Sequence, residues 1–121
     1  MKTIFVVDDS DTNLAMAEEA LEDYYNVMTV PSAAKMFALL EKMMPDLILL
    51  DIEMPEMNGF EALKKLKDGS SPDIPVVFLT GTTSAEIEEQ GSKLGAVGIV
   101  TKPFSADSLL DYIEQLITSS N

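Results

Sequence analysis

Residues 47–63 read LILLDIEMPEMNGFEAL, and this stretch decides the class of fold. Its first four residues are continuously apolar, which is typical of a strand covered on both faces in a parallel sheet. Asp51 follows this run, and Asn58 and Glu61 then have the spacing of a capping box at the start of a helix. The stretch therefore predicts a strand, an acidic residue at its end, and a helix that returns across the sheet.

Similar strand-and-helix units lie on either side of this stretch. Short apolar runs are separated by segments whose apolar residues recur at helical spacing. The expected strands are residues 3–7, 26–30, 47–50, 76–79 and 97–100. Five strands that alternate with five helices predict an α/β fold, (βα)₅, with a doubly wound parallel sheet between two layers of helices.

The fourth expected helix has the weakest apolar pattern of the five. Thr83 stands three residues before Glu86, so Thr83 is its expected N-cap. Ile87, Gly91 and Leu94 are expected to face the sheet from this helix. We therefore expect it to be packed more weakly than the other four.

Composition narrows the classes of function. A chain of 121 residues fits one domain, over residues 1–121. The net charge of −13 disfavours nucleic acid and anionic membranes as partners, because phosphate binding needs a concentrated basic patch. Cys and His are absent, which excludes thiolate catalysis and removes the usual general base. No apolar run is long enough for a signal peptide or a membrane span, so we expect a cytoplasmic protein.

Polar residues gather where the expected strands end. In open α/β sheets the site lies outside the carboxyl ends of the strands. Asp8 and Asp9 follow the first strand, Asp51 the third, Thr80 the fourth, and Lys102 lies just after the fifth. Three neighbouring carboxylates repel one another, and this arrangement would destabilise the fold unless cations lie among them. Lys102 supplies one positive charge, and a hard divalent cation, with Mg²⁺ as the natural candidate, would supply the rest.

These residues give the chain a resemblance to a known family. It resembles the receiver domains of response regulators in two-component signalling, in particular the stand-alone chemotaxis type. The matching segments are VVDDS at 6–10, the stretch around Asp51, VVFLTG at 76–81 and GAVGIVTKPF at 95–104. The resemblance covers nearly the whole chain and implies the flavodoxin-like strand order 2-1-3-4-5.

The resemblance implies an acceptor and a metal site. Asp51 would be the phosphoryl acceptor, a carboxylate nucleophile that forms an aspartyl phosphate. Asp8 and Asp9 would hold Mg²⁺ together with Asp51 and the backbone carbonyl of Glu53, with Mn²⁺ as an alternative ion. A phosphoprotein of two-component phosphorelay signalling is therefore expected.

The resemblance also implies how the phosphoryl group is held and where it comes from. Thr80 would hydrogen-bond the group and Lys102 would pair with its oxygens, with a cis peptide bond before Pro103. The donor would be a phosphohistidine on a sensor histidine kinase or a His-containing phosphotransfer protein, because this chain has no His.

The same resemblance implies an output by binding. Phosphorylation would change the surface of the fourth helix, fifth strand and fifth helix, which would then bind a downstream effector protein. The chain would be a monomer or a phosphorylation-dependent dimer. It would be no enzyme toward a separate substrate, and at most would catalyse its own phosphorylation and dephosphorylation.

Two residues depart from the common receiver pattern. Ile99 stands where many receivers have a Tyr or Phe that turns inward on activation, so we expect output to depend on Thr80 and the fourth helix. Glu53 adds a fourth acid beside the site. It is either a surface acid that contributes only its backbone carbonyl, or a side chain that alters hydrolysis of the phosphorylated aspartate.

Two other classes of protein share parts of this pattern. A Mg²⁺-dependent phosphohydrolase of the haloacid dehalogenase type would use Asp9-x-Asp11, but it would leave Asp51 without a role. A flavodoxin-like FMN carrier would need a phosphate loop after the first strand, where aspartates would repel the FMN phosphate. Turnover of a small phosphate ester would favour the first alternative, and a coloured protein the second.

Overall fold

Strands and helices alternate strictly along the chain. The structure, a computed structural model, describes residues 1–69, 73–82 and 84–119. Its elements are β1 (Thr3–Val7), α1 (Asp11–Leu21), β2 (Asn26–Val30), α2 (Ala33–Leu40), β3 (Leu47–Asp51), α3 (Gly59–Asp68), β4 (Val76–Thr80), α4 (Ala85–Leu94), β5 (Gly98–Thr101) and α5 (Ala106–Ser119). In these described ranges no helix is both long enough and apolar enough to cross a membrane.

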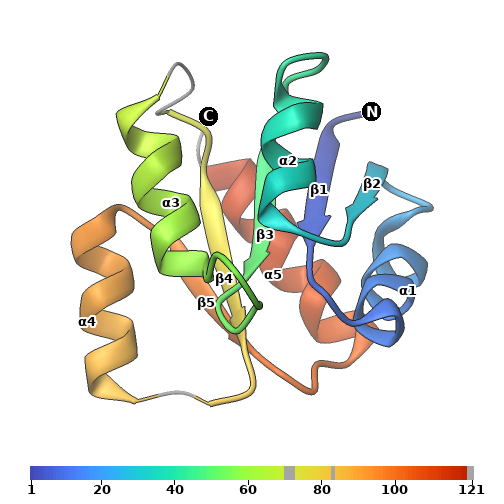
Figure 1. The fold of residues 1–121 in the computed structure, drawn as a ribbon. Coiled ribbons are helices and arrows are strands. Elements are labelled where there is room, and N and C mark those ends of the chain that lie inside the picture. Colours follow the sequence, from blue (N-terminus) through green and yellow to red (C-terminus); the bar gives the residue numbers. More distant parts are fainter. Residues whose placement is uncertain (70–72, 83, 120–121) are drawn as a thin grey trace.

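The strands form one parallel sheet in the order β2-β1-β3-β4-β5. Figure 1 shows α5 behind the sheet and α2 and α3 in front of it. The predicted flavodoxin-like order and the three-layer αβα architecture are thus both confirmed.

Strand side chains alternate between two hydrophobic cores, as the two-residue period of a strand requires. Phe5 and Val7 pack on one face with residues of α2 and α3, and α4 adds partly buried side chains there. Ile4 and Val6 pack on the other face with residues of α1 and α5. Because both faces of the central strands are buried, their sequences are continuously apolar.

Three strands end one residue later than their apolar runs predict. Asp51 and Thr80 are the last residues of β3 and β4, and β5 covers residues 98–101 instead of 97–100. Asp51 is paired with Leu79 in the sheet register, and Thr80 with Thr101. Backbone pairing continues through polar residues because the ladder uses main-chain groups. These polar side chains therefore start from the rigid sheet.

Side-chain caps begin the helices, as local hydrogen bonding to free N–H groups predicts. The capping box of Asn58 and Glu61 is present at α3. At α4 the prediction of Thr83 was wrong, because the hydroxyl of Ser84 accepts the capping bond from the N–H of Ile87. Thr83 itself lies outside the described residues. Gly95 ends α4 in the left-handed conformation, at φ 97°.

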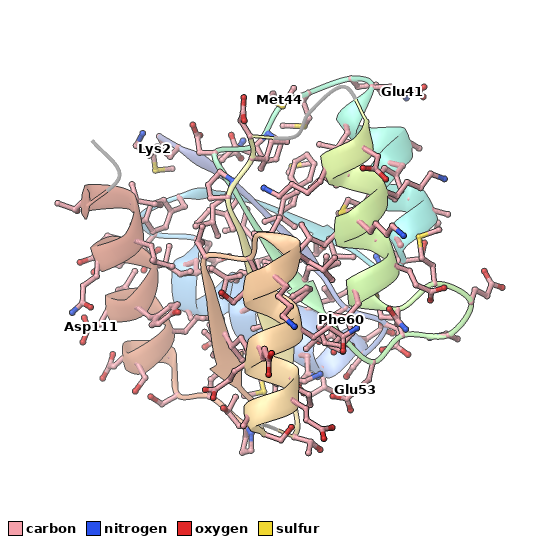
Figure 2. The ribbon with its side chains drawn as sticks, turned by 90° about the vertical axis from the view of Figure 1, so that its left-hand side faces the viewer. Lys2, Glu41, Met44, Glu53, Phe60 and Asp111 are labelled. Carbon is pink, nitrogen blue, oxygen red and sulfur yellow. The ribbon has the colours of Figure 1, made fainter. Side chains whose placement is uncertain are left out.

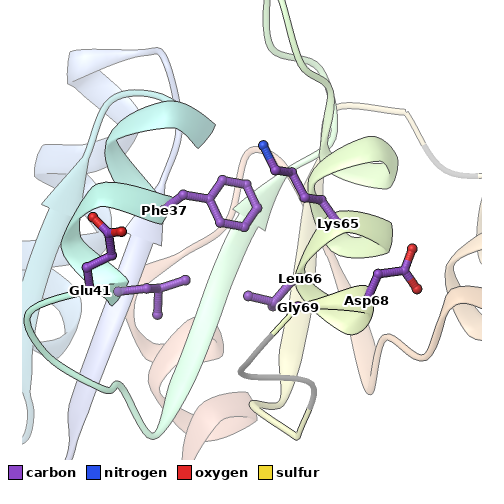
Figure 3. A pocket seen from close by; sticks show the side chains of 7 residues that line it. Phe37, Glu41, Lys65, Leu66, Asp68 and Gly69 are labelled. Atoms are coloured by element: carbon purple, nitrogen blue, oxygen red, sulfur yellow. The ribbon is translucent and has the colours of Figure 1, made fainter.

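A groove of about 450 Å³ lies between α2 and α3 (Figure 3). The ammonium of Lys65 lies 5.0 Å from the centre of the Phe37 ring, a cation–π distance. Glu41 and Asp68 line the groove with Leu66. None of the aspartates at the strand ends lines it, so this hollow is separate from the acidic edge of the sheet.

The loop after β3 folds back closely onto that strand at Gly59. The N–H of Gly59 donates to the carbonyl of Ile52 at 2.9 Å. A Cβ atom at this position would lie 2.6 Å from the carbonyl oxygen of Asp51 and 2.8 Å from the Cα of Ile52. Only glycine allows this approach without moving the backbone that carries Asp51.

We predict that Gly59→Ala destabilises the fold by about 1–3 kcal/mol, the usual effect of overpacking a well-packed site. Urea unfolding at equilibrium measures this change. Gly81→Ala is the matched control, because a Cβ there would meet no atom within 4 Å. Equal midpoints for the two variants would contradict the prediction.

Candidate functional site

Buried polar side chains mark the carboxyl ends of the central strands. Among residues whose burial the structure describes, the buried polar or charged ones are Asp8, Asp51 and Thr80. Asp8 directly follows β1, and its N–H donates to the carbonyl of Val30 at 3.1 Å. Burying charge without compensation is costly, so the groups around these carboxylates define the site.

Lys102 is the cation that lies between the two buried carboxylates and compensates part of their charge. Its Nζ lies 3.0 Å from Asp51 Oδ1 and 3.4 Å from Asp8 Oδ2. The N–H of Lys102 donates to the carbonyl of Thr80 at 2.7 Å, which attaches this segment to the end of β4. The peptide bond between Lys102 and Pro103 is cis. The predicted convergence of residues far apart in the sequence is therefore present.

Backbone N–H groups hold the two aspartates in place. The N–H of Ser10 donates to Asp8 Oδ1 at 2.9 Å, and the N–H of Glu53 donates to Asp51 Oδ1 at 3.2 Å. Each bond spans two residues, the local turn that aspartate side chains favour. Asp51 thus receives hydrogen bonds on Oδ1, and its carboxylate is fixed before any ligand binds.

Asp9 completes an acidic cluster with the two buried aspartates. One carboxylate oxygen from each of Asp8, Asp9 and Asp51 lies within 4.8 Å of the others. Asp9 is exposed, so the cluster is open to solvent on that side. With Lys102 present, three carboxylates still leave an excess of negative charge.

Burial and the neighbouring charges both affect the ionisation of Asp51. Burial raises the pKa of its carboxyl to about 6, and the charge of Asp8 acts in the same direction, against the hydrogen bond and charge of Lys102. Burial alone would lower the pKa of Lys102, but the hydrogen bond and charge of Asp51, together with Asp8, leave it raised. Asp51 is therefore a carboxylate whose charge is incompletely compensated.

Thr80 is hydrogen-bonded to Glu53, a contact that the sequence did not predict. Thr80 Oγ1 donates at 2.7 Å toward Glu53 Oε1 and toward the carbonyl of Thr82, and accepts from the N–H of Thr82 at 3.1 Å. Figure 2 shows Glu53 at the same end of the molecule as Phe60 and opposite Lys2 and Met44. The sequence around Glu53 contains no motif that indicates a partner 27 residues away.

Ile99 lies on β5 beside the weakly packed α4. It is partly buried and packs against the core on that face. The one buried residue of α4 is Gly91, which faces Phe78, with Ile99 nearby. Ile87 and Leu94 are partly buried, and the acidic residues of α4 are exposed. The predicted inward face of this helix is confirmed.

The family of the chain follows from comparison with known proteins. The sequence model of one protein family, the response regulator receiver domain, matches residues 4–114 of this chain. The chain therefore belongs to the response regulator receiver family, and it is a receiver domain of two-component signalling. Receiver domains act with a histidine kinase or phosphotransfer partner and with a downstream effector. This membership decides against the phosphohydrolase and FMN-carrier alternatives.

Individual relatives differ in how much of their length the chain covers. A probable cyclic di-GMP phosphodiesterase of Vibrio cholerae is 42% identical over 104 residues, 85% of this chain and 24% of that protein. The chain thus spans about a quarter of that relative, and its phosphodiesterase name belongs to the whole protein. Protein PilH of Pseudomonas aeruginosa is 33% identical and matches 97% of this chain and 98% of its own length.

A solved structure gives the same result. The chemotaxis response regulator CheY4 of Vibrio cholerae superposes with a TM-score of 0.90 at 33% identity. The match covers 95% of this chain and 98% of that one. The chain is therefore similar to a chemotaxis receiver over nearly its whole length.

We predict that Asp51→Asn stabilises the metal-free protein near neutral pH. The raised pKa means that stability from this carboxyl is present below about pH 4 and lost as the pH rises through about 6. Near pH 7 in EDTA, the variant should gain about 1–3 kcal/mol in free energy of unfolding, and much less near pH 4.

Urea unfolding at both pH values measures the gain. Asp111→Asn, which removes an exposed charge from α5, is the control and should change stability little at either pH. A gain for Asp51→Asn that is larger near pH 4 than near pH 7 would show that the sign is wrong.

Proposed function

We propose that residues 1–121 form one phospho-acceptor domain in which Asp51 receives a phosphoryl group. The observation that carries this proposal is the buried pair of Asp8 and Asp51, held by Lys102 at the carboxyl ends of β1 and β3. Asp51 is fixed by hydrogen bonds, ends a rigid strand and lies beside an exposed opening at Asp9. We also propose, on the sequence grounds above, that the domain works in the cytoplasm.

The acidic cluster fits a divalent cation. Its donors are carboxylate oxygens within 4.8 Å of one another, the ligand type that Mg²⁺ prefers and Mn²⁺ also accepts. Asp8, Asp9 and Asp51 would hold the ion, with the backbone carbonyl of Glu53 as a further ligand. When bound, Mg²⁺ would neutralise negative charge on the oxygens of the phosphoryl group.

The transfer step uses the fixed carboxylate as a nucleophile. A carboxylate oxygen of Asp51 attacks the phosphorus of a phosphohistidine on a donor protein, and the phosphorus–oxygen bond forms as the phosphorus–nitrogen bond breaks. The donor nitrogen keeps the electron pair of that bond. Lys102 pairs with the phosphoryl oxygens, and the hydroxyl of Thr80 donates a hydrogen bond to one of them. The proposal includes no separate substrate: the domain assists only its own phosphorylation and dephosphorylation.

Output would pass through α4, β5 and α5 to an effector protein. Phosphorylation biases a two-state equilibrium, and the element with the least buried contact is the one most easily shifted. Among the helices that element is α4, which has Gly91 as its one buried residue. Ile99 on the neighbouring β5 has no aromatic ring that could rotate inward, so the proposed output depends on α4. The domain would act as a monomer or dimerise when phosphorylated.

Incubation with acetyl phosphate and Mg²⁺ tests the acceptor. We predict one labile phosphoryl adduct by intact mass, absent in Asp51→Ala and absent when EDTA removes the metal. Asp111→Ala is the control and should be labelled like the wild type. An adduct that persists in Asp51→Ala would show that another residue is the acceptor.

Chemical-shift mapping with beryllofluoride and Mg²⁺ tests the output surface. Because α4 is weakly held, we predict that the largest amide shifts outside the site occur in residues 85–94. The residues of α2, which lie away from the proposed surface, serve as the internal control. Shifts that spare residues 85–94 would contradict the proposed role of α4.

A further inference from the structure

The hydroxyl of Thr80 is fully engaged in the resting structure. Its single proton has two acceptors at 2.7 Å, Glu53 Oε1 and the carbonyl oxygen of Thr82. Its oxygen accepts the N–H of Thr82 at 3.1 Å. Within the described residues, none of its hydrogen bonds joins it to Asp51. A phosphoryl oxygen on Asp51 would therefore have to compete with these two acceptors for the hydrogen bond from the Thr80 hydroxyl.

Of the two acceptors, the Glu53 carboxylate forms the stronger hydrogen bond with the Thr80 hydroxyl. A hydroxyl that donates to an ionised carboxylate at 2.5–2.7 Å makes a bond roughly twice as strong as a neutral one. Thr80 is completely buried, so water cannot readily replace Glu53 as the acceptor of its hydroxyl. Glu53 is exposed and lies in the loop after β3, so its side chain can turn away from Thr80 into solvent.

Glu53 is also bonded to the acceptor itself. Its N–H donates to Asp51 Oδ1 at 3.2 Å while its side chain accepts from Thr80. One residue thus connects the proposed phosphorylation site to the hydroxyl that would bind the phosphoryl group. A phosphoryl group on Asp51 would bring negative charge close to the Glu53 carboxylate and repel it.

We propose that Glu53 is a positioning residue that restrains Thr80 in the resting state and releases it on phosphorylation. This inference deepens the proposed function and rests on it. In the resting chain the Glu53 carboxylate holds the Thr80 hydroxyl. On phosphorylation the new phosphoryl group repels this carboxylate and replaces it as the acceptor of the Thr80 proton. The restraint makes the unphosphorylated domain less prone to adopt its active arrangement.

Affinity for beryllofluoride at saturating Mg²⁺, measured by fluorine NMR titration, tests the restraint. Glu53→Ala should bind about 5- to 30-fold more tightly, because one competitor for Thr80 is removed. Glu53→Gln should gain less, since its amide oxygen still accepts the bond without the charge. Glu56→Gln, an exposed acid in the same loop, is the control for a change of charge and should bind like the wild type.

The same comparison in a Thr80→Val background separates the hydrogen bond from simple charge repulsion. Without the hydroxyl, the gain from Glu53→Ala should shrink to about twofold or less, because the coupling between the two residues is gone. Equal gains in both backgrounds, or equal gains for Glu53→Ala and Glu53→Gln, would overturn the restraint.

A second measurement does not require the Thr80→Val variant to bind beryllofluoride. In the free protein, Glu53→Ala should move the γ-methyl signal of Thr80 and the amide signal of Thr82 toward their beryllofluoride-bound positions. Unmoved signals would overturn the inference. A wild type that binds no beryllofluoride would instead overturn the proposed function, and the restraint with it.

Discussion

The ammonium of Lys102 lies 3.0 Å from one buried carboxylate and 3.4 Å from another, and the geometry of the site depends on this arrangement. Asp8 directly follows β1 and Asp51 ends the neighbouring β3, so the backbone register forces their charges together. One cation cannot balance two carboxylates, and burial together with the charge of Asp8 raises the pKa of Asp51. This unbalanced buried charge is what fits the site to the cation and the phosphoryl group of the proposed function.

The rest of the fold keeps these charges in place. Ser10 caps α1 and Asn58 caps α3. These caps fix the ends of the two segments that connect Asp8 and Asp51 to the helices that follow them. Gly59 brings the loop after β3 within contact of the Asp51 backbone. The same loop carries Glu53, whose side chain accepts a hydrogen bond from Thr80. Packing and electrostatics therefore act on one short segment.

The main features of the site could be predicted from the sequence, because strand ends in a parallel sheet must meet at one edge. Asp8, Asp51 and Lys102 are brought together on that principle alone, whereas the strand order came from the family resemblance. The bond between Glu53 and Thr80 could not be predicted, since it depends on how a loop side chain turns. The last residues of β3 and β4 were missed because apolar character ends before backbone pairing does.

The sparse packing of α4 has a consequence for how such domains diversify. Gly91 is its buried residue, and its charged side chains point into solvent. Exposed positions tolerate substitution within about 0.5 kcal/mol, so the outer surface of this helix can change with little effect on stability. With the proposed output through α4, mutation and selection can therefore change what this helix binds while the residues at the strand ends stay constant.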